Sequence, residues 1–230
     1  IISNVNSPEE CYKERNNSNF EFIMSIKKTY HVLVLLCAVL FVASCKEVDD
    51  TVEEFPNWQA VNEAKFTELY NTAKQKIAAG DTSWKIIKQW SMPAEPTDFN
   101  VKPENCIVVE VIKEGTGSGC PIYSDAVRCH YQGRLLPSTS YKDGMVFDQS
   151  YYGTFNEATA EPSRFSVSSV VDGFSTALQN MHIGDAWRVY IPYQLGYGNT
   201  QSEGSSIPAC STLIFEIRLV KYGPSSNLDE

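Results

Sequence analysis

The stretch from Val170 to Gly198 constrains the fold more than any other part of the chain. Its first half carries apolar residues at the spacing of one helix face, which predicts a short helix. Asp172 is expected to cap the start of this helix, because its carboxylate can accept amide protons of the first turn, and Gly184 is expected to end it. The apolar face consists of Phe174, Ala177, Leu178 and Met181.

The second half of the stretch predicts a strand from Trp187 to Ile191, which Pro192 and a loop rich in tyrosine and glycine close. A short helix that lies against a sheet and is flanked by aromatic side chains encloses a small apolar pocket. The stretch therefore favours a binding pocket over a polar active site.

The composition excludes several classes of function. The chain has 230 residues and a net charge of −9, whereas nucleic-acid binding needs clustered lysine and arginine. Only three histidines are present, so a histidine-rich metal site is not expected. There is no P-loop, dinucleotide fingerprint or HExxH motif, and no cofactor is expected.

Residues 24–44 resemble a bacterial lipoprotein signal peptide. Two lysines precede an apolar run, residues 32–42, that is too short to span a membrane comfortably. The run ends in VASC, which resembles a lipobox, so Cys45 is the expected lipidation site and residues 1–23 are expected to precede the start of translation. An ordinary signal peptide or an N-terminal anchor helix is the alternative.

Residues 45–105 are predicted to form an acidic tether, a helix and a proline-containing linker. Lys46 rather than aspartate follows Cys45, so the lipoprotein resemblance implies an anchor in the cell envelope on the outer membrane, on its periplasmic or surface side. The helix is predicted from Asn57 to Ala79. Its apolar face either packs on its own domain or forms a homodimer or holds a client. That face consists of Trp58, Phe66, Leu69, Ala73 and Ile77.

Four cysteines follow the lipobox, namely Cys106, Cys120, Cys129 and Cys210. An exported protein can form disulfides, but four cysteines allow three pairings. Cys106 and Cys120 stand at either end of an apparent hairpin and are the candidate pair. Free buried thiols are the alternative.

From Cys106 onward the pattern favours β-strands, and the fold class predicted is α+β, with the short helix covering the concave side of an antiparallel sheet. On one strand, Val127, Cys129 and Tyr131 share a face. His130 points to the opposite face and is expected to be a surface or hydrogen-bonded core histidine. The strands are predicted at residues 107–113, 125–135, 165–167 and 212–222.

Five motifs in order carry a family resemblance. They are HYQGRL (130–135), KDGMVFDQS (142–150), VVDGF (170–174), IPYQLGYG (191–198) and IPACSTLIFEIRL (207–219). Together they resemble an FKBP-type peptidyl-prolyl cis-trans isomerase. The resemblance implies an FKBP-like antiparallel half-barrel around one short helix at residues 106–223, an N-terminal helical extension and a C-terminal tail, residues 224–230.

The resemblance also implies a set of pocket residues. The proline ring of a substrate would rest on Phe174, the amide of Val171 and the hydroxyl of Tyr197 would hold its carbonyls, and Asp148 would orient it. Phe174 stands where the family usually has tryptophan. The full set is Tyr131, Phe147, Asp148, Val171, Phe174 and Tyr197 as catalytic residues, with Phe165, Val170, Ile207 and Phe215 as substrate-binding residues.

The implied activity is rotation of X–Pro bonds in exported, proline-containing polypeptides, with no metal or cofactor. An aromatic pocket would remove water from the prolyl amide and favour its twisted form. Macrolide inhibitors are further expected ligands. The alternative is a protein-binding or chaperone module on the same scaffold, with weak or no isomerase activity.

Overall fold

The computed structural model describes Met24, Lys27 and residues 52–92, 101–201 and 204–228. The chain divides into two units, residues 1–51 and 52–230. The predicted signal peptide and Cys45 therefore fall outside the described residues, apart from Met24 and Lys27. Within the described part, no helix combines the length and apolar character that a membrane crossing requires.

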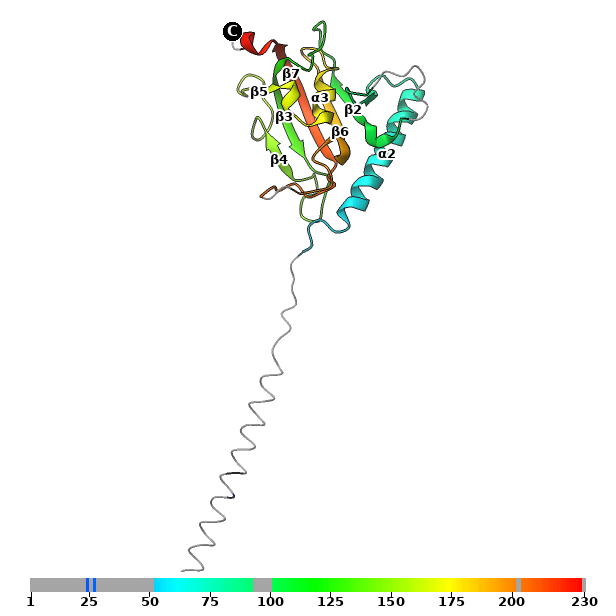
Figure 1. Ribbon diagram of the computed structural model, residues 1–230, viewed down its shortest axis with the longest axis vertical. Coiled ribbons are helices and arrows are strands. Elements are labelled where there is room, and N and C mark those ends of the chain that lie inside the picture. The colour runs from blue at the N-terminus through cyan, green and yellow to red at the C-terminus, as the bar shows by residue number, and fades with distance from the viewer. Residues whose placement is uncertain (1–23, 25–26, 28–51, 93–100, 202–203, 229–230) are drawn as a thin grey trace, which may run out of the picture. The chain divides into compact units, whose positions relative to one another are not determined.

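A seven-stranded antiparallel sheet forms the body of the second unit, with the order β1-β2-β6-β7-β3-β4 and β5 paired to β3 (Figure 1). This confirms the α+β class predicted from the sequence. The strands are β1 (Trp84–Lys88), β2 (Cys106–Lys113), β3 (Ala126–Arg134), β4 (Val146–Gln149), β5 (Ser163–Ser166), β6 (Ala186–Ile191) and β7 (Leu213–Gly223).

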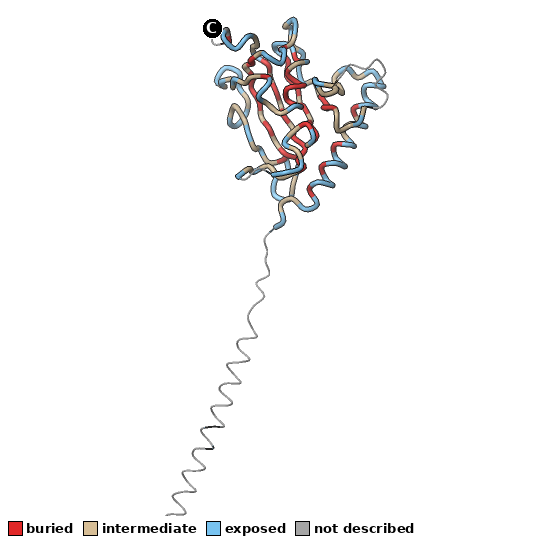
Figure 2. The backbone as a smooth tube through the Cα atoms, viewed as in Figure 1, coloured by how far each residue is buried: buried red, intermediate tan, exposed pale blue. Residues whose placement is uncertain are grey.

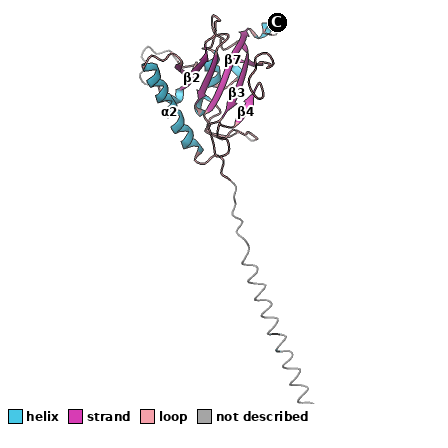
Figure 3. Cartoon of the chain, turned by 180° about the vertical axis from the view of Figure 1, so that it is seen from behind, coloured by secondary structure: helices cyan, strands magenta, loops and turns pink. Residues whose placement is uncertain are grey.

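Among the described residues from 52 onward, two α-helices and four single-turn helices accompany the sheet. The α-helices are α2 (Trp58–Ala78) and α3 (Asp172–Leu178). Figure 3 shows the sheet from behind, with α2 on the β2 side of the sheet. The short 3-10 turns are η1 (Pro103–Asn105), η2 (Val167–Ser169), η3 (Tyr193–Leu195) and η4 (Ser225–Asn227).

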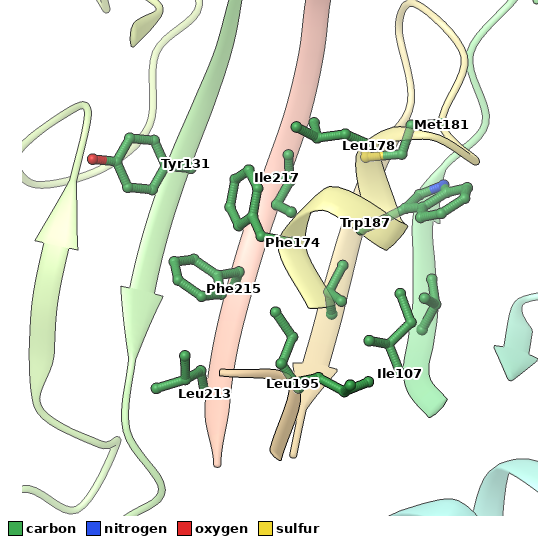
Figure 4. Close-up of a cluster of buried hydrophobic side chains, with 14 of the residues drawn as sticks. Ile107, Tyr131, Phe174, Leu178, Met181, Trp187, Leu195, Leu213, Phe215 and Ile217 are labelled. Carbon is green, nitrogen blue, oxygen red and sulfur yellow. The ribbon is translucent and has the colours of Figure 1, made fainter. Parts of the chain in front are cut away.

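Helix α3 covers the inner face of the sheet, and the main core lies between them. Phe174, Leu178 and Met181 are buried there against strand residues such as Trp187 and Ile217 (Figure 4). Close approach of α3 to β6 requires glycine at residue 173, because a Cβ there would lie 2.3 Å from Cγ2 of Ile191.

Both predicted ends of this helix are wrong. Val171 is the N-cap, and Asp172 is already the first helical residue; its carboxylate accepts a hydrogen bond from Nε2 of Gln89 at 2.8 Å instead of capping the helix. The helix ends at Leu178, because the chain turns there to reach β6. Gly184, with φ of +92°, serves that later turn.

Helix α2 packs on its own domain, which confirms that prediction for its apolar face. Asn62 is buried with Trp58, Phe66 and Ala73 on this side, and the tube in Figure 2 alternates between buried and exposed along the helix. The Nε1 of Trp58 donates to Oγ of Ser211 at 2.8 Å. At the C-terminal end of α2 the predicted apolar face is not buried, since Ile77 is exposed.

The candidate disulfide between Cys106 and Cys120 is wrong. No disulfide joins them, and each side chain is a thiol. Cys106 begins β2, whereas Cys120 lies beyond its other end, where its Sγ is 3.4 Å from Nδ1 of His182. A strand advances by about 3.3 Å per residue, so the length of β2 separates the two thiols by more than a disulfide can bridge.

Candidate functional site

A cavity of about 220 Å³ opens on the inner side of the sheet, beside the start of α3. Its walls come from β3, β4, β5, β7, η2, α3 with the two residues before it, and the loop after η3. The lining residues are Tyr131, Asp148, Phe165, Ser169, Val170, Val171, Phe174, Tyr197 and Phe215. Eight of these nine belong to the set implied by the family resemblance.

The floor of the cavity is a cluster of perpendicular aromatic rings. The centroids of Phe174 and Phe215 are 4.9 Å apart at 85°, and those of Tyr131 and Phe165 are 5.2 Å apart at 73°. Such edge-to-face pairs are favoured by the ring quadrupoles. Figure 4 shows Tyr131, Phe174 and Phe215 together on the side of α3 that faces β3.

Two predicted residues lie behind this lining. The ring of Phe147 packs at 5.5 Å and 90° against Phe215, at the irregularity where β4 leaves register with β3, and so supports the floor from behind. Ile207 is half-buried and packs against the core. The alternation of a regular strand cannot locate a bulged residue such as Phe147.

Ser169 is the lining residue that the sequence reasoning missed. It ends η2, and its hydroxyl donates to the carbonyl of Ser166 at 2.8 Å. A serine in a polar turn carries no motif, so only its position directly before Val170 could have indicated it.

The polar groups gather on one side of the cavity. Burial raises the pKa of the Tyr131 phenol, and a hydrogen bond to Asp148 raises that pKa further. Burial also raises the pKa of Tyr197, with a smaller contribution from the Asp148 carboxylate. Tyr131 is buried, whereas Tyr197 remains 53% exposed at the rim. Both hydroxyls therefore stay protonated at neutral pH and can donate hydrogen bonds.

The arrangement is suited to binding and desolvation. Pockets that bind drug-sized ligands have volumes of about 300–1,000 Å³, so this smaller cavity fits one ring or side chain of a longer chain. Tyr197 and Asp148 add polar groups to the lining, with Tyr197 at the exposed rim. Among the described residues, no group of three or more His, Cys, Asp or Glu side chains could hold a metal ion.

Residues 120–220 match the family model described as FKBP-type peptidyl-prolyl cis-trans isomerase. This part of the chain belongs to the FKBP family. Every residue that lines the cavity lies inside the matched segment, whereas α2, β1 and β2 lie outside it. The FKBP segment therefore carries the whole pocket, and the N-terminal elements extend its sheet.

Curated relatives agree with this assignment. The chain is 39% identical over 118 residues to the FKBP-type 22 kDa peptidyl-prolyl cis-trans isomerase of Escherichia coli, covering 51% of this chain and 50% of that protein. It is 39% identical over 111 residues to the outer membrane protein MIP of Legionella longbeachae, covering 48% and 42%. The chain thus spans about half the length of the curated relatives it matches.

A solved structure of a peptidyl-prolyl cis-trans isomerase from Pseudomonas syringae pv. tomato has a TM-score of 0.47 and 27% identity, covering 70% of this chain and 96% of that one.

Proposed function

We propose that the protein is a peptidyl-prolyl cis-trans isomerase that accelerates rotation about X–Pro bonds in exported polypeptides. The observation that carries this proposal is the aromatic cavity, in which Tyr131, Phe174 and Phe215 form an apolar floor beside the hydrogen-bonding groups of Asp148 and Tyr197. Membership of the FKBP family supports the same activity.

The reaction needs no covalent step. Rotation about a peptide bond must overcome about 18–20 kcal/mol, because amide resonance is lost in the twisted form. The planar amide is more dipolar than the twisted one, so moving it from water to an apolar pocket raises its free energy more. A pocket that favours the twisted amide lowers the barrier.

Each pocket residue has a specific role in this proposal. The proline ring rests on Phe174, whose ring is 4% exposed and held against Phe215. The N–H of Val171 precedes the first turn of α3, so no carbonyl of that helix accepts from it, and it can donate to a substrate carbonyl. The hydroxyl of Tyr197 donates to a second carbonyl from the open rim.

The test is NMR exchange spectroscopy on a Phe-Pro peptide, which needs no coupled protease. The proposal predicts that catalytic amounts of the wild-type protein raise the cis-trans exchange rate well above that in buffer. An exchange rate equal to that in buffer, with the protein folded, would refute it.

A chaperone module is the second candidate, and an exposed aromatic pair favours it. Trp90 and Tyr123 stack at 4.3 Å and are 36% and 43% exposed, and neighbouring Ile122 is 61% exposed. Exposed apolar groups of this kind can hold an unfolded chain. If unfolded protein stays soluble while the Phe-Pro exchange rate matches buffer, the chaperone function replaces the isomerase.

We further propose a lipid anchor in the cell envelope at Cys45, and the name of the Legionella relative as an outer membrane protein supports it. Labelled palmitate should be incorporated into the wild-type protein and not into Cys45→Ser. Continued incorporation into the variant would refute the anchor. We also propose a homodimer through α2, which sedimentation tests. Binding of macrolide inhibitors is proposed as well, and inhibition of the exchange rate tests it.

A further inference from the structure

Residues 151–162, which follow Ser150 in the connection between β4 and β5, cross to the outer face of the sheet and are held there by one aromatic side chain. We call this segment the insert. The ring of Phe155 packs at 5.0 Å against His130 and at 5.0 Å against Tyr151. The guanidinium of Arg218 lies 4.5 Å from the centroid of the same ring. Phe155 therefore fixes the insert to β3 and β7.

His130 is an unusual partner for this ring. The residue is 4% exposed, so the expectation of a surface histidine is wrong, and its Nδ1 has no hydrogen-bond partner among the described residues. It borders a cavity of about 150 Å³ that Phe155 also lines. A buried imidazole in this setting is far easier to keep neutral than charged.

The charged groups around His130 come from four elements. Arg218 on β7 disfavours a second positive charge, whereas Glu157 and Glu161 of the insert favour one. Lys113 at the end of β2 and Asp185 before β6 also line the cavity. Asp185 already accepts from the amides of Gly115 and His182. Burial disfavours the charged imidazole more strongly than the two glutamates favour it, so the pKa of His130 lies below its ordinary value.

The insert is joined directly to the pocket wall. Ser150, the residue before it, donates from its amide to the carbonyl of Tyr131 at 2.9 Å, and its Oγ accepts from the Tyr131 amide at 2.9 Å. Asp148 is two residues further back. Tyr131 also follows His130 in β3, so one side of the strand holds the insert while the other lines the pocket.

We propose that Phe155 latches the insert to the sheet only while His130 is uncharged, and that the latch positions the Tyr131 and Asp148 wall of the pocket. Protonation of His130 creates a buried charge next to Arg218, and that charge is stable only if the Phe155 ring moves away and admits water. His130 and Phe155 are positioning residues, and the effect on isomerisation rests on the proposed function.

The direction of the pH effect follows from proton linkage. In the open state His130 is exposed and takes up a proton near its ordinary pKa of about 6.5, whereas the latched state takes it up only at lower pH. The ratio of open to latched protein therefore rises as pH falls through this window, by up to about tenfold per pH unit for one proton.

The experiment is hydrogen-deuterium exchange of the insert amides between pH 7.5 and 5.0, with each rate divided by its intrinsic rate at that pH. Wild-type protein should show protection that falls steeply below about pH 6.5. His130→Gln should remove this pH dependence. Phe155→Ala should leave the insert open at both ends of the range, whereas Tyr152→Ala, at a side chain that is 88% exposed, should behave as wild type.

Three results would overturn the proposal: protection in the wild type that does not change with pH, an unchanged slope in His130→Gln, or equal opening in Tyr152→Ala and Phe155→Ala. If His130→Gln does not fold, NMR titration of His130 in the wild type decides. Its midpoint should lie below 6.5 and coincide with loss of protection, and an ordinary midpoint would overturn the latch. None of these readouts requires isomerase activity, so the latch and the proposed function can fail separately.

Discussion

Phe147 lies directly over Gly133, so closely that a Cβ at residue 133 would be 2.7 Å from Cζ of the ring. Cε1 of Phe215 would be 2.6 Å away. Because residue 133 has no side chain, the rings of Phe147 and Phe215 can pack over β3 and support the pocket floor. The glycine in the HYQGRL motif is therefore a packing requirement of the pocket.

Gly133→Ala should lower the free energy of unfolding by about 1–3 kcal/mol, because an added methyl group overpacks the core. Urea denaturation measures the loss. Phe147→Ala provides the matched test, since removing the ring should make Gly133→Ala less costly in the double variant. Additive effects of the two substitutions would show that the contact is not responsible.

Asn62 is expected to stabilise the packing of α2 against the sheet. Its Oδ1 accepts from the amide of Thr212 at 2.7 Å in a fully buried position, and its Nδ2 donates to the carbonyl of Trp58 at 2.7 Å. Asn62→Ala leaves that amide without its acceptor and should cost about 1–3 kcal/mol of unfolding free energy. Asn71→Ala, on the exposed side of α2, should cost much less. Equal losses would contradict the role of Asn62 in holding α2 against the sheet.

The buried phenol of Tyr131 predicts a loss of stability at alkaline pH. Its folded pKa is raised, so its contribution is fully present below the unfolded value of about 10. Above that pH the unfolded chain releases the proton first, and the free energy of unfolding falls by up to about 1.4 kcal/mol per pH unit. Denaturation at pH 9 to 11 should show a shallower fall for Tyr131→Phe. Tyr152→Phe should keep the wild-type slope, and a wild-type slope in both would refute the assignment.

Most of the fold could be predicted from local patterns. The helix face at Phe66 and Ala73 and the alternation through Phe215 and Ile217 are buried as expected, because side-chain periodicity determines which face reaches the core. The ends of α3 could not be predicted, since they depend on where Gln89 and the turn before β6 lie. Gly184 lies in a turn. Glycine is common both in turns and at helix ends, so the residue type alone could not show which of the two Gly184 occupies.

The site was less fully predictable. The family resemblance indicated eight of the nine lining residues, seven of them within its motifs, but Phe147 and Ile207 pack behind the lining and Ser169 is the ninth lining residue. The environment of His130 depends on the insert, whose length and path no motif encodes. Pocket residues in helices and strands were therefore easier to identify than residues whose contacts are made by loops.

The Phe-Pro exchange rate, measured with pocket variants and their matched controls, tests most directly whether the cavity catalyses isomerisation. Tyr197→Phe and Asp148→Ala should each lower kcat/KM by about tenfold, the effect of losing about 1.4 kcal/mol of transition-state binding. Tyr152→Phe and Asp143→Ala change the same residue types at exposed positions outside the cavity and should leave it unchanged. Rates equal to wild type in both pocket variants, with the domain folded, would contradict the account.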